Sequence, residues 1–190
     1  MIHMLDPEKV VIQGDISRAD VRVLAEICSN KNVVEFGVGG STLILAQCAA
    51  SIVSYDTDIS WIERTKHRID TMEKITVPQF VHMPTVPESI PECDVLFIDG
   101  YGPHRCEWTR HFLRCKVMLL HDSLGDTGLG PTIDDLLSKI FTIREIVENL
   151  DLMKFHYLDS NMVVVYKRET PIRFLNWNTV EDNNRKSPYS

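Results

Sequence analysis

The fold is limited above all by an alternation of short apolar runs with longer runs of helical periodicity. Runs such as Val95–Ile98 are apolar without interruption, as expected of strands that are buried on both faces. The expected strands are 33–36, 51–55, 79–83, 95–98 and a fifth within KVMLLHDS, and the expected helices are 17–30, 42–50, 59–72, 105–113 and 131–141. This order predicts an α/β protein with a doubly wound, mostly parallel sheet covered by helices on both faces.

Three polar residues mark where the expected helices begin and end. Ser17, with Asp20 three residues later, has the spacing of a helix N-terminal capping box. Asn30 is a suitable stop for that helix, and Asp58 can cap the helix that begins at Ile59. The helix 17–30 is therefore expected to precede the first strand of the sheet.

The end of the chain departs from the alternation. The runs LMKFHYL and NMVVVYKR, joined through Asp159-Ser160, indicate a hairpin. A hairpin at this point adds an antiparallel C-terminal edge to the parallel sheet. We expect one domain over residues 1–170, with its core in 31–168, and a partly mobile tail over 171–190.

Composition and charge disfavour several classes of function. The net charge is −7, and no basic face is evident, so nucleic acid is disfavoured as a partner. No apolar run approaches the roughly 20 residues of a membrane span, and the N-terminal sequence lacks signal-peptide features. The five cysteines are odd in number and contain no C-x-x-C pair, so we expect reduced thiols in a cytoplasmic protein. The oligomeric state stays open, since apolar residues in 174–177 could pack on the domain or on a second copy in a dimer.

Polar residues collect where the expected strands end, and ligands of such sheets bind at the carboxyl ends of the strands. The informative stretches are 35–42, 56–58, 82–83, 99–104 and 121–123. In the first of these, Gly37 and Gly39 follow a strand and open a helix, the context of a nucleotide-binding loop. Thr42 replaces the third glycine of the dinucleotide fingerprint, and the lysine of a P-loop is missing.

Two carboxylates near this loop indicate that its ligand contains a nucleoside but no phosphate groups. Asp56 lies about 20 residues past the loop, where a carboxylate can accept hydrogen bonds from ribose hydroxyls. Glu35 adds a negative charge at the tip of the first strand, which would repel a diphosphate and attract a cationic ligand.

The motifs VVEFGVGGSTLILA and VSYDTD resemble the first two motifs of class I S-adenosylmethionine-dependent methyltransferases. The segment DVLFIDGYGPH…VMLLHDS resembles their fourth and fifth strands, and the pattern is similar to a bacterial and phage branch of small-molecule O-methyltransferase-like proteins. The resemblance extends over about 17–167. It implies a Rossmann-like methyltransferase fold and S-adenosyl-L-methionine as cofactor.

The resemblance also implies roles for particular residues. Backbone at Gly37, Val38, Gly39 and Gly40 would approach the methionine part of the cofactor, with Glu35 near its ammonium group. The other implied cofactor contacts are Ser41 and Thr42 at the carboxylate, Asp56 and Thr57 at the ribose, His82 and Met83 at the adenine, and Asp99 at the cleft. The acidic residue that many relatives carry after the third strand is absent at Met83 and Pro84.

Catalysis is expected from the ends of the fourth and fifth strands. Asp99 and Asp122 should face one cleft, and His104 is a candidate general base in the loop after Asp99. In the catechol-type enzymes that the pattern resembles, equivalent positions hold Mg²⁺, and here Asp99, Asp122 and Ser123 could do so. His121 is a second candidate base, with a structural role as the equal alternative.

The sequence therefore predicts a methyltransferase that acts on a hydroxyl of a small molecule or sugar. Two alternatives remain open. One is an NAD-dependent oxidoreductase, which Glu35 and Thr42 disfavour, and the other is a non-catalytic module with a methyltransferase-like fold. Cys115-Lys116, in place of a glycine pair usual before the fifth strand, keeps the second alternative open.

Overall fold

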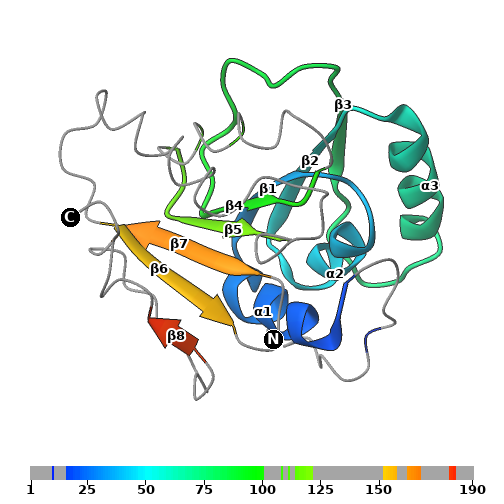
Figure 1. Cartoon of the computed structure of the whole chain (residues 1–190). Helices are drawn as coiled ribbons and strands as arrows, with labels where there is room; N and C mark the ends of the chain where they lie inside the picture. Colours follow the sequence, from blue (N-terminus) through cyan, green and yellow to red (C-terminus); the bar gives the residue numbers. More distant parts are fainter. Residues whose placement is uncertain are drawn as a thin grey trace.

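The structure, a computed structural model, describes residues 10, 16–100, 108, 111, 114–121, 152–157, 162–167 and 180–182. In this part of the chain the strands form a single eight-stranded sheet of order β3-β2-β1-β4-β5-β7-β6-β8 (Figure 1). The strands are β1 Asn32–Phe36, β2 Ser51–Asp56, β3 Gln79–His82, β4 Val95–Ile98, β5 Val117–Leu120, β6 Leu152–Tyr157, β7 Val163–Lys167 and β8 Val180–Asp182.

The first five strands are parallel. β1 lies at their centre, with Val33 opposite Ile52 of β2 on one side and opposite Val95 of β4 on the other. β4 in turn pairs with β5, with Ile98 opposite Leu120. The carboxyl ends of β1, β2, β4 and β5 therefore reach the same edge of the sheet, as the doubly wound prediction requires.

The C-terminal strands form the predicted hairpin, but their order in the sheet was not predicted. β6 and β7 pair antiparallel, as expected. However, β7 lies between β5 and β6 and is antiparallel to both, so the hairpin is inserted in reverse order along the sheet. A further strand, β8, pairs with β6 inside the segment for which the sequence indicated only a tail. Three residues with ordinary polar composition carry too little periodicity to be recognised as a strand.

Three helices are described: α1 Arg18–Cys28, α2 Gly40–Cys48 and α3 Ile59–Ile69. Ser17 and Asp20 form the predicted capping box on α1, and Asp58 accepts a hydrogen bond from Ser60 N at the start of α3. Asn30, at φ 57°, takes the left-handed conformation that ends a helix. Each helix ends two or three residues before its predicted end, a difference common at helix termini. α2 also begins at Gly40, two residues before its predicted start.

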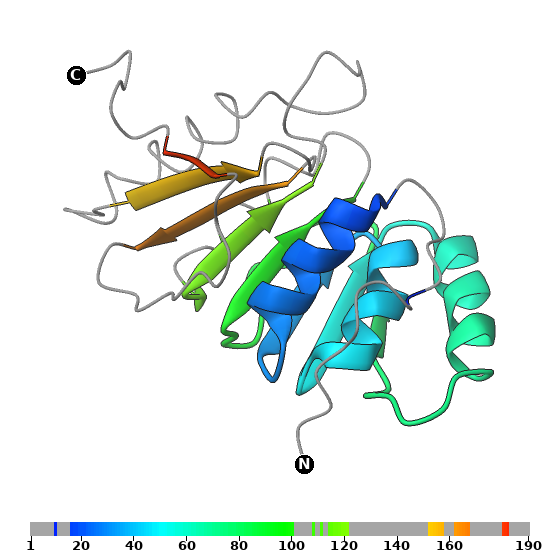
Figure 2. The ribbon, with the colours of Figure 1, turned by 90° about the horizontal axis from the view of Figure 1, so that it is seen from below.

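Figure 2 shows α1, α2 and α3 on one face of the sheet. That face holds one apolar cluster, in which side chains such as Leu24 and Leu45 pack on alternate strand residues such as Val33 and Phe97. The opposite face holds a second cluster, in which Phe36, Leu96 and Leu120 meet apolar residues of the 86–93 segment and Trp108. The sheet is thus buried on both faces, as its continuous apolar strands predicted.

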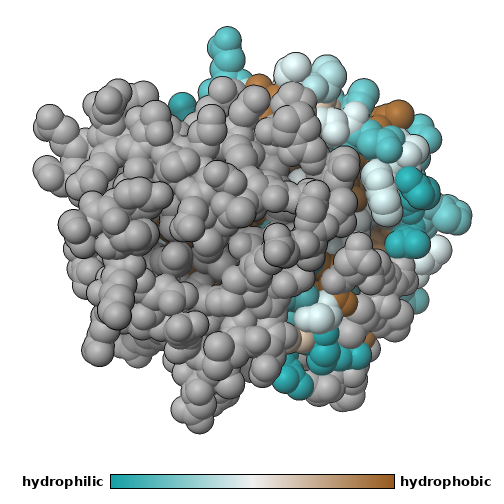
Figure 3. Space-filling view, viewed as in Figure 1, coloured by the Kyte–Doolittle hydropathy of each residue, from teal (hydrophilic) through white to brown (hydrophobic). Residues whose placement is uncertain are grey.

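The surface over α3 is mostly hydrophilic on the face shown in Figure 3, with isolated apolar residues. Ile59 and Trp61 of α3 are exposed, and Arg64 covers the Trp61 ring at 4.2 Å from its centroid. Among the described residues, no helix is long and apolar enough to cross a bilayer. The predicted helix 131–141 lies outside the described residues, as does most of the predicted helix 105–113.

Candidate functional site

The loop between β1 and α2 is held against the backbone that follows β4. Gly37 has φ +102°, and a Cβ placed there would lie 2.3 Å from the backbone N of Gly100. The Asp99 and Gly100 amides both donate to the Phe36 carbonyl at 2.8 Å, while Gly37 N–H donates to Tyr55 O at 2.9 Å. Glycine at 37 is therefore required for the contact between two neighbouring strand ends.

Gly39 has a different environment. It is half-buried and has extended φ, and a Cβ built on it would meet no atom within 4 Å among the described residues. Its amide donates to Thr42 Oγ1 at 2.9 Å, and Gly40 begins α2 directly after it. No described residue therefore covers the Gly39 backbone at the N-terminus of α2, where a ligand could approach main-chain atoms closely.

Glu35 lies beneath this loop and is fully buried. Its carboxylate accepts hydrogen bonds from Ser41 Oγ (2.7 Å), Thr42 Oγ1 (2.8 Å) and Ser54 Oγ (2.6 Å). Burial raises the pKa of Glu35 to about 7, although the three hydroxyl groups lower it in part. The hydroxyl groups of Ser41 and Thr42 thus turn inward to Glu35, and direct contacts of these three residues with a ligand stay predictions.

Asp56 ends β2 beside the glycine loop. One carboxylate oxygen accepts from Val38 N and the other from Asp58 N, each at 2.8 Å. Desolvation raises the pKa of Asp56, and these backbone hydrogen bonds oppose the rise. Each carboxylate oxygen has more than one acceptor site, so Asp56 can hold the loop and still accept a hydrogen bond from a ligand hydroxyl.

The end of β3 lies next to that of β2. Met83 N–H donates to Asp56 O at 2.9 Å, and His82 Nε2 lies 3.1 Å from Thr57 O. His82 is exposed and Met83 is half-buried. The structure thus brings the predicted ribose-side and adenine-side residues, Asp56, Thr57, His82 and Met83, to one edge of the sheet.

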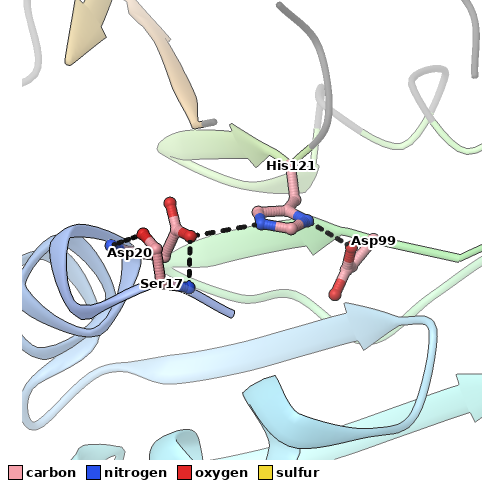
Figure 4. A network of polar contacts seen from close by, with 4 residues as sticks. All are labelled: Ser17, Asp20, Asp99 and His121. Carbon is pink, nitrogen blue, oxygen red and sulfur yellow. Dashed lines mark hydrogen bonds and ion pairs between the residues drawn. The ribbon is translucent and has the colours of Figure 1, made fainter. Parts of the chain in front are cut away.

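Asp99 follows β4 and belongs to a polar network shown in Figure 4. Its Oδ1 lies 2.8 Å from Nδ1 of His121, the residue after β5. Nε2 of His121 lies 3.5 Å from Oδ2 of Asp20, the residue that also accepts from Ser17 N in the α1 cap. The His121 and Asp20 side chains are 2% and 1% exposed, whereas the Asp99 side chain is 20% exposed. Of these three side chains, Asp99 is thus the one that remains accessible, at the carboxyl end of β4.

In this network His121 lies between the carboxylates of Asp99 and Asp20. Its role as a base, and the structural alternative, stay predictions. Asp20 was not predicted as part of the site, because its spacing from Ser17 predicted only a helix cap. The sequence feature that could have indicated this role is a carboxylate among the apolar residues of the buried helix face. Its contact with His121 is seen only once α1 packs against the sheet.

Three other predicted catalytic and metal residues, His104, Asp122 and Ser123, lie outside the described residues. Within the described ranges, no group of three His, Cys, Asp or Glu side chains is arranged to hold a metal ion. Trp108 is 1% exposed and stacks on Phe36 at 4.6 Å between ring centroids, so it belongs to the core under the site.

No protein-family model and no curated protein matches the chain. Solved structures do match. A protein from Staphylococcus aureus proposed to be a caffeoyl-CoA O-methyltransferase matches with TM-score 0.54 and 13% identity, over 84% of this chain and 86% of that one. An rRNA methylase from Streptococcus thermophilus matches with TM-score 0.52 and 13% identity, over 83% and 99%.

A third match is phosphoethanolamine N-methyltransferase 1 from Haemonchus contortus, solved with phosphoethanolamine and S-adenosylhomocysteine. It has TM-score 0.50 and 16% identity, and the match covers 78% of this chain and 41% of that one. The chain has the Rossmann-like methyltransferase fold. At these identities the likeness concerns the fold, and the three proteins differ in the acceptors that their names state.

Proposed function

We propose that this protein binds S-adenosyl-L-methionine and transfers its methyl group to a hydroxyl on a small molecule or sugar. The proposal depends on one observation, the open backbone at Gly39 beside the Asp56 carboxylate, at adjacent carboxyl ends of β1 and β2. Gly37–Gly40 would accept the methionine part of the cofactor, Asp56 its ribose, and His82 and Met83 its adenine. S-adenosyl-L-methionine, when bound, supplies a methyl group on a positively charged sulfur.

The rest of the proposed reaction concerns the acceptor. Transfer to a hydroxyl requires that its proton be removed while the oxygen is held in line with the methyl group. Asp99 is 20% exposed, and His121 fixes one of its two carboxylate oxygens. We therefore assign to Asp99 the acceptance of this proton or, alternatively, the coordination of Mg²⁺ together with Asp122 and Ser123. His104 is the other candidate base.

The acidic chain supports a small-molecule acceptor over RNA. Its net charge is −7, and enzymes that hold phosphate backbones usually carry a basic face. The rRNA methylase among the matching structures makes RNA the alternative acceptor to test.

The binding step is tested by calorimetric titration with S-adenosylhomocysteine. Gly39→Leu should weaken binding at least about tenfold, because its side chain would enter the open space, and Asp56→Asn should do the same by removing a carboxylate oxygen. Asp70→Asn, at the far end of α3, is the matched control and should bind like the unmodified chain. Unchanged affinity in both site variants, or binding of NADH instead, would overturn the proposal.

The acceptor is tested next with S-adenosylmethionine carrying a labelled methyl group. Label should pass to phenolic or sugar hydroxyl compounds and not to RNA. Binding without transfer to any acceptor class would favour the non-catalytic module.

A further inference from the structure

Two cysteines lie side by side at the amino ends of β4 and β5, away from the sheet edge that carries the glycine loop. Cys93 precedes β4 by two residues, and Cys115 precedes β5 by two residues. Strand pairing continues to this point, because Cys93 N–H donates to Arg114 O at 3.2 Å and Lys116 N–H donates to Asp94 O at 3.1 Å. Neighbouring strands are about 4.7–4.9 Å apart, which lies within the Cα separation of about 4.4–6.8 Å that a disulfide spans.

The two thiols also point the same way. Both belong to the apolar cluster on the face opposite α1 and α2. The Cys115 thiol makes a side-chain hydrogen bond to Cys93, and the backbone of Val34 makes another. Cys93 is 8% exposed and follows the exposed residue Glu92, whereas Cys115 is 3% exposed. Cys93 is therefore the more accessible residue of the two.

Cys28 and Cys48, on the other face of the sheet, differ from Cys93 in the direction of their pKa shifts. The Cys115 hydrogen bond holds the pKa of Cys93 below its usual value, against the effect of burial. Burial instead raises the pKa of Cys48 to about 12 and that of Cys28 well above its usual value. The thiolate is the reactive form of cysteine. Although all four of these cysteines are buried, we therefore expect Cys93 to be more reactive than Cys28 and Cys48.

We propose that Cys93 and Cys115 form a peroxide-sensitive dithiol, in which Cys93 is oxidised and Cys115 resolves it to a disulfide. The Cys93 thiolate attacks one oxygen of hydrogen peroxide and the O–O bond breaks. This gives a sulfenic acid and a hydroxide ion, which takes up a proton to become water. The Cys115 sulfur then attacks the Cys93 sulfur, the S–O bond breaks and a second water leaves. In sum, two thiols and one peroxide give one disulfide and two waters.

The disulfide would close a segment that contains Asp99 and Gly100, the residues in contact with the glycine loop. It would therefore join the starts of β4 and β5 and restrain the backbone between them. We expect the oxidised protein to melt roughly 5–10 °C higher than the reduced one, through the smaller entropy of its unfolded chain. The proposal does not depend on the methyltransferase assignment.

In the test, the folded protein is treated with hydrogen peroxide and its remaining thiols are blocked. Tryptic peptides are then mapped by mass without reduction of disulfides. The expected product joins peptide 75–105, which holds Cys93, to peptide 115–116, with loss of two hydrogen atoms and full reversal by dithiothreitol. Oxidation of Cys93 should be at least about tenfold faster than that of Cys28 or Cys48.

Two variants complete the experiment. Cys115→Ser should leave Cys93 as a sulfenic acid that dimedone traps, with no joined peptide. Cys28→Ser is the matched control and should give the same joined peptide at the same rate. Absence of the 93–115 link in the folded protein, a link that forms only after unfolding, or equal oxidation of all cysteines would overturn the proposal.

Discussion

At the scale of single residues, Glu35 shows how the fold changes the chemistry of a side chain. Its folded pKa of about 7 lies above the ordinary value of 4.5 because the carboxylate is fully buried. Between these two values the folded protein binds more protons than the unfolded chain, so stability contributed by Glu35 is present below pH 4.5 and is lost as pH rises to about 7. The loss is about 3 kcal/mol by linkage, to order of magnitude.

Glu35→Gln should remove this pH dependence, because an amide does not titrate and hydroxyl groups can rotate to accept from it. Urea unfolding of both proteins at several pH values between 5 and 8 measures the pH dependence of the free energy of unfolding. We expect the unmodified protein to lose about 2–3 kcal/mol more than the variant across this range. Parallel pH profiles for the two proteins would show that Glu35 titrates normally.

At the scale of an element, the loop that joins β1 to α2 contains glycines with different requirements. Gly37→Ala should cost about 3 kcal/mol or more in the free energy of unfolding, because of positive φ and contact with Gly100 backbone. Gly39→Ser should change stability by less than about 0.5 kcal/mol, since the space is open and serine is a favourable helix cap. Urea midpoints measure both variants, and equal midpoints would contradict the close approach of the two strand ends.

At the scale of the whole molecule, the contact of Asp20 with His121 joins α1 to the strands β4 and β5. Removing one partner of a buried polar contact is costly because the other partner loses that contact, and removing the second partner then costs less. We expect Asp20→Ala and His121→Ala to show a coupling energy of about 1–2 kcal/mol in a double-mutant cycle of unfolding free energies.

The control cycle pairs Asp20→Ala with Lys116→Ala, a residue at the opposite end of β5 that contacts Asp94. These two changes should be additive within about 0.5 kcal/mol. If the Asp20 and His121 changes are equally additive, α1 is held to the sheet by its apolar face alone.

The sequence by itself was sufficient for the order and type of the described elements from α1 to β7, but not for β8. Strands β4 and β5 are recognisable because a strand buried on both faces is apolar along its length. Strand β1 follows the same pattern at Val33, Val34 and Phe36, with Glu35 as its buried polar exception. The α1 cap and the stop at Asn30 are local hydrogen-bond and backbone preferences, which need no knowledge of distant residues. The edge that carries the site followed from parallel strands alone, since their carboxyl ends coincide.

Only the tertiary structure decided what each polar group contacts. It directed Ser41 and Thr42 inward to Glu35, joined Asp56 to the Val38 amide and linked Asp20 to Asp99 through His121. It also inserted β7 between β5 and β6 and paired β8 with β6. These outcomes depend on contacts between residues far apart in the chain, whose energies are set by burial and geometry and are not contained in local periodicity.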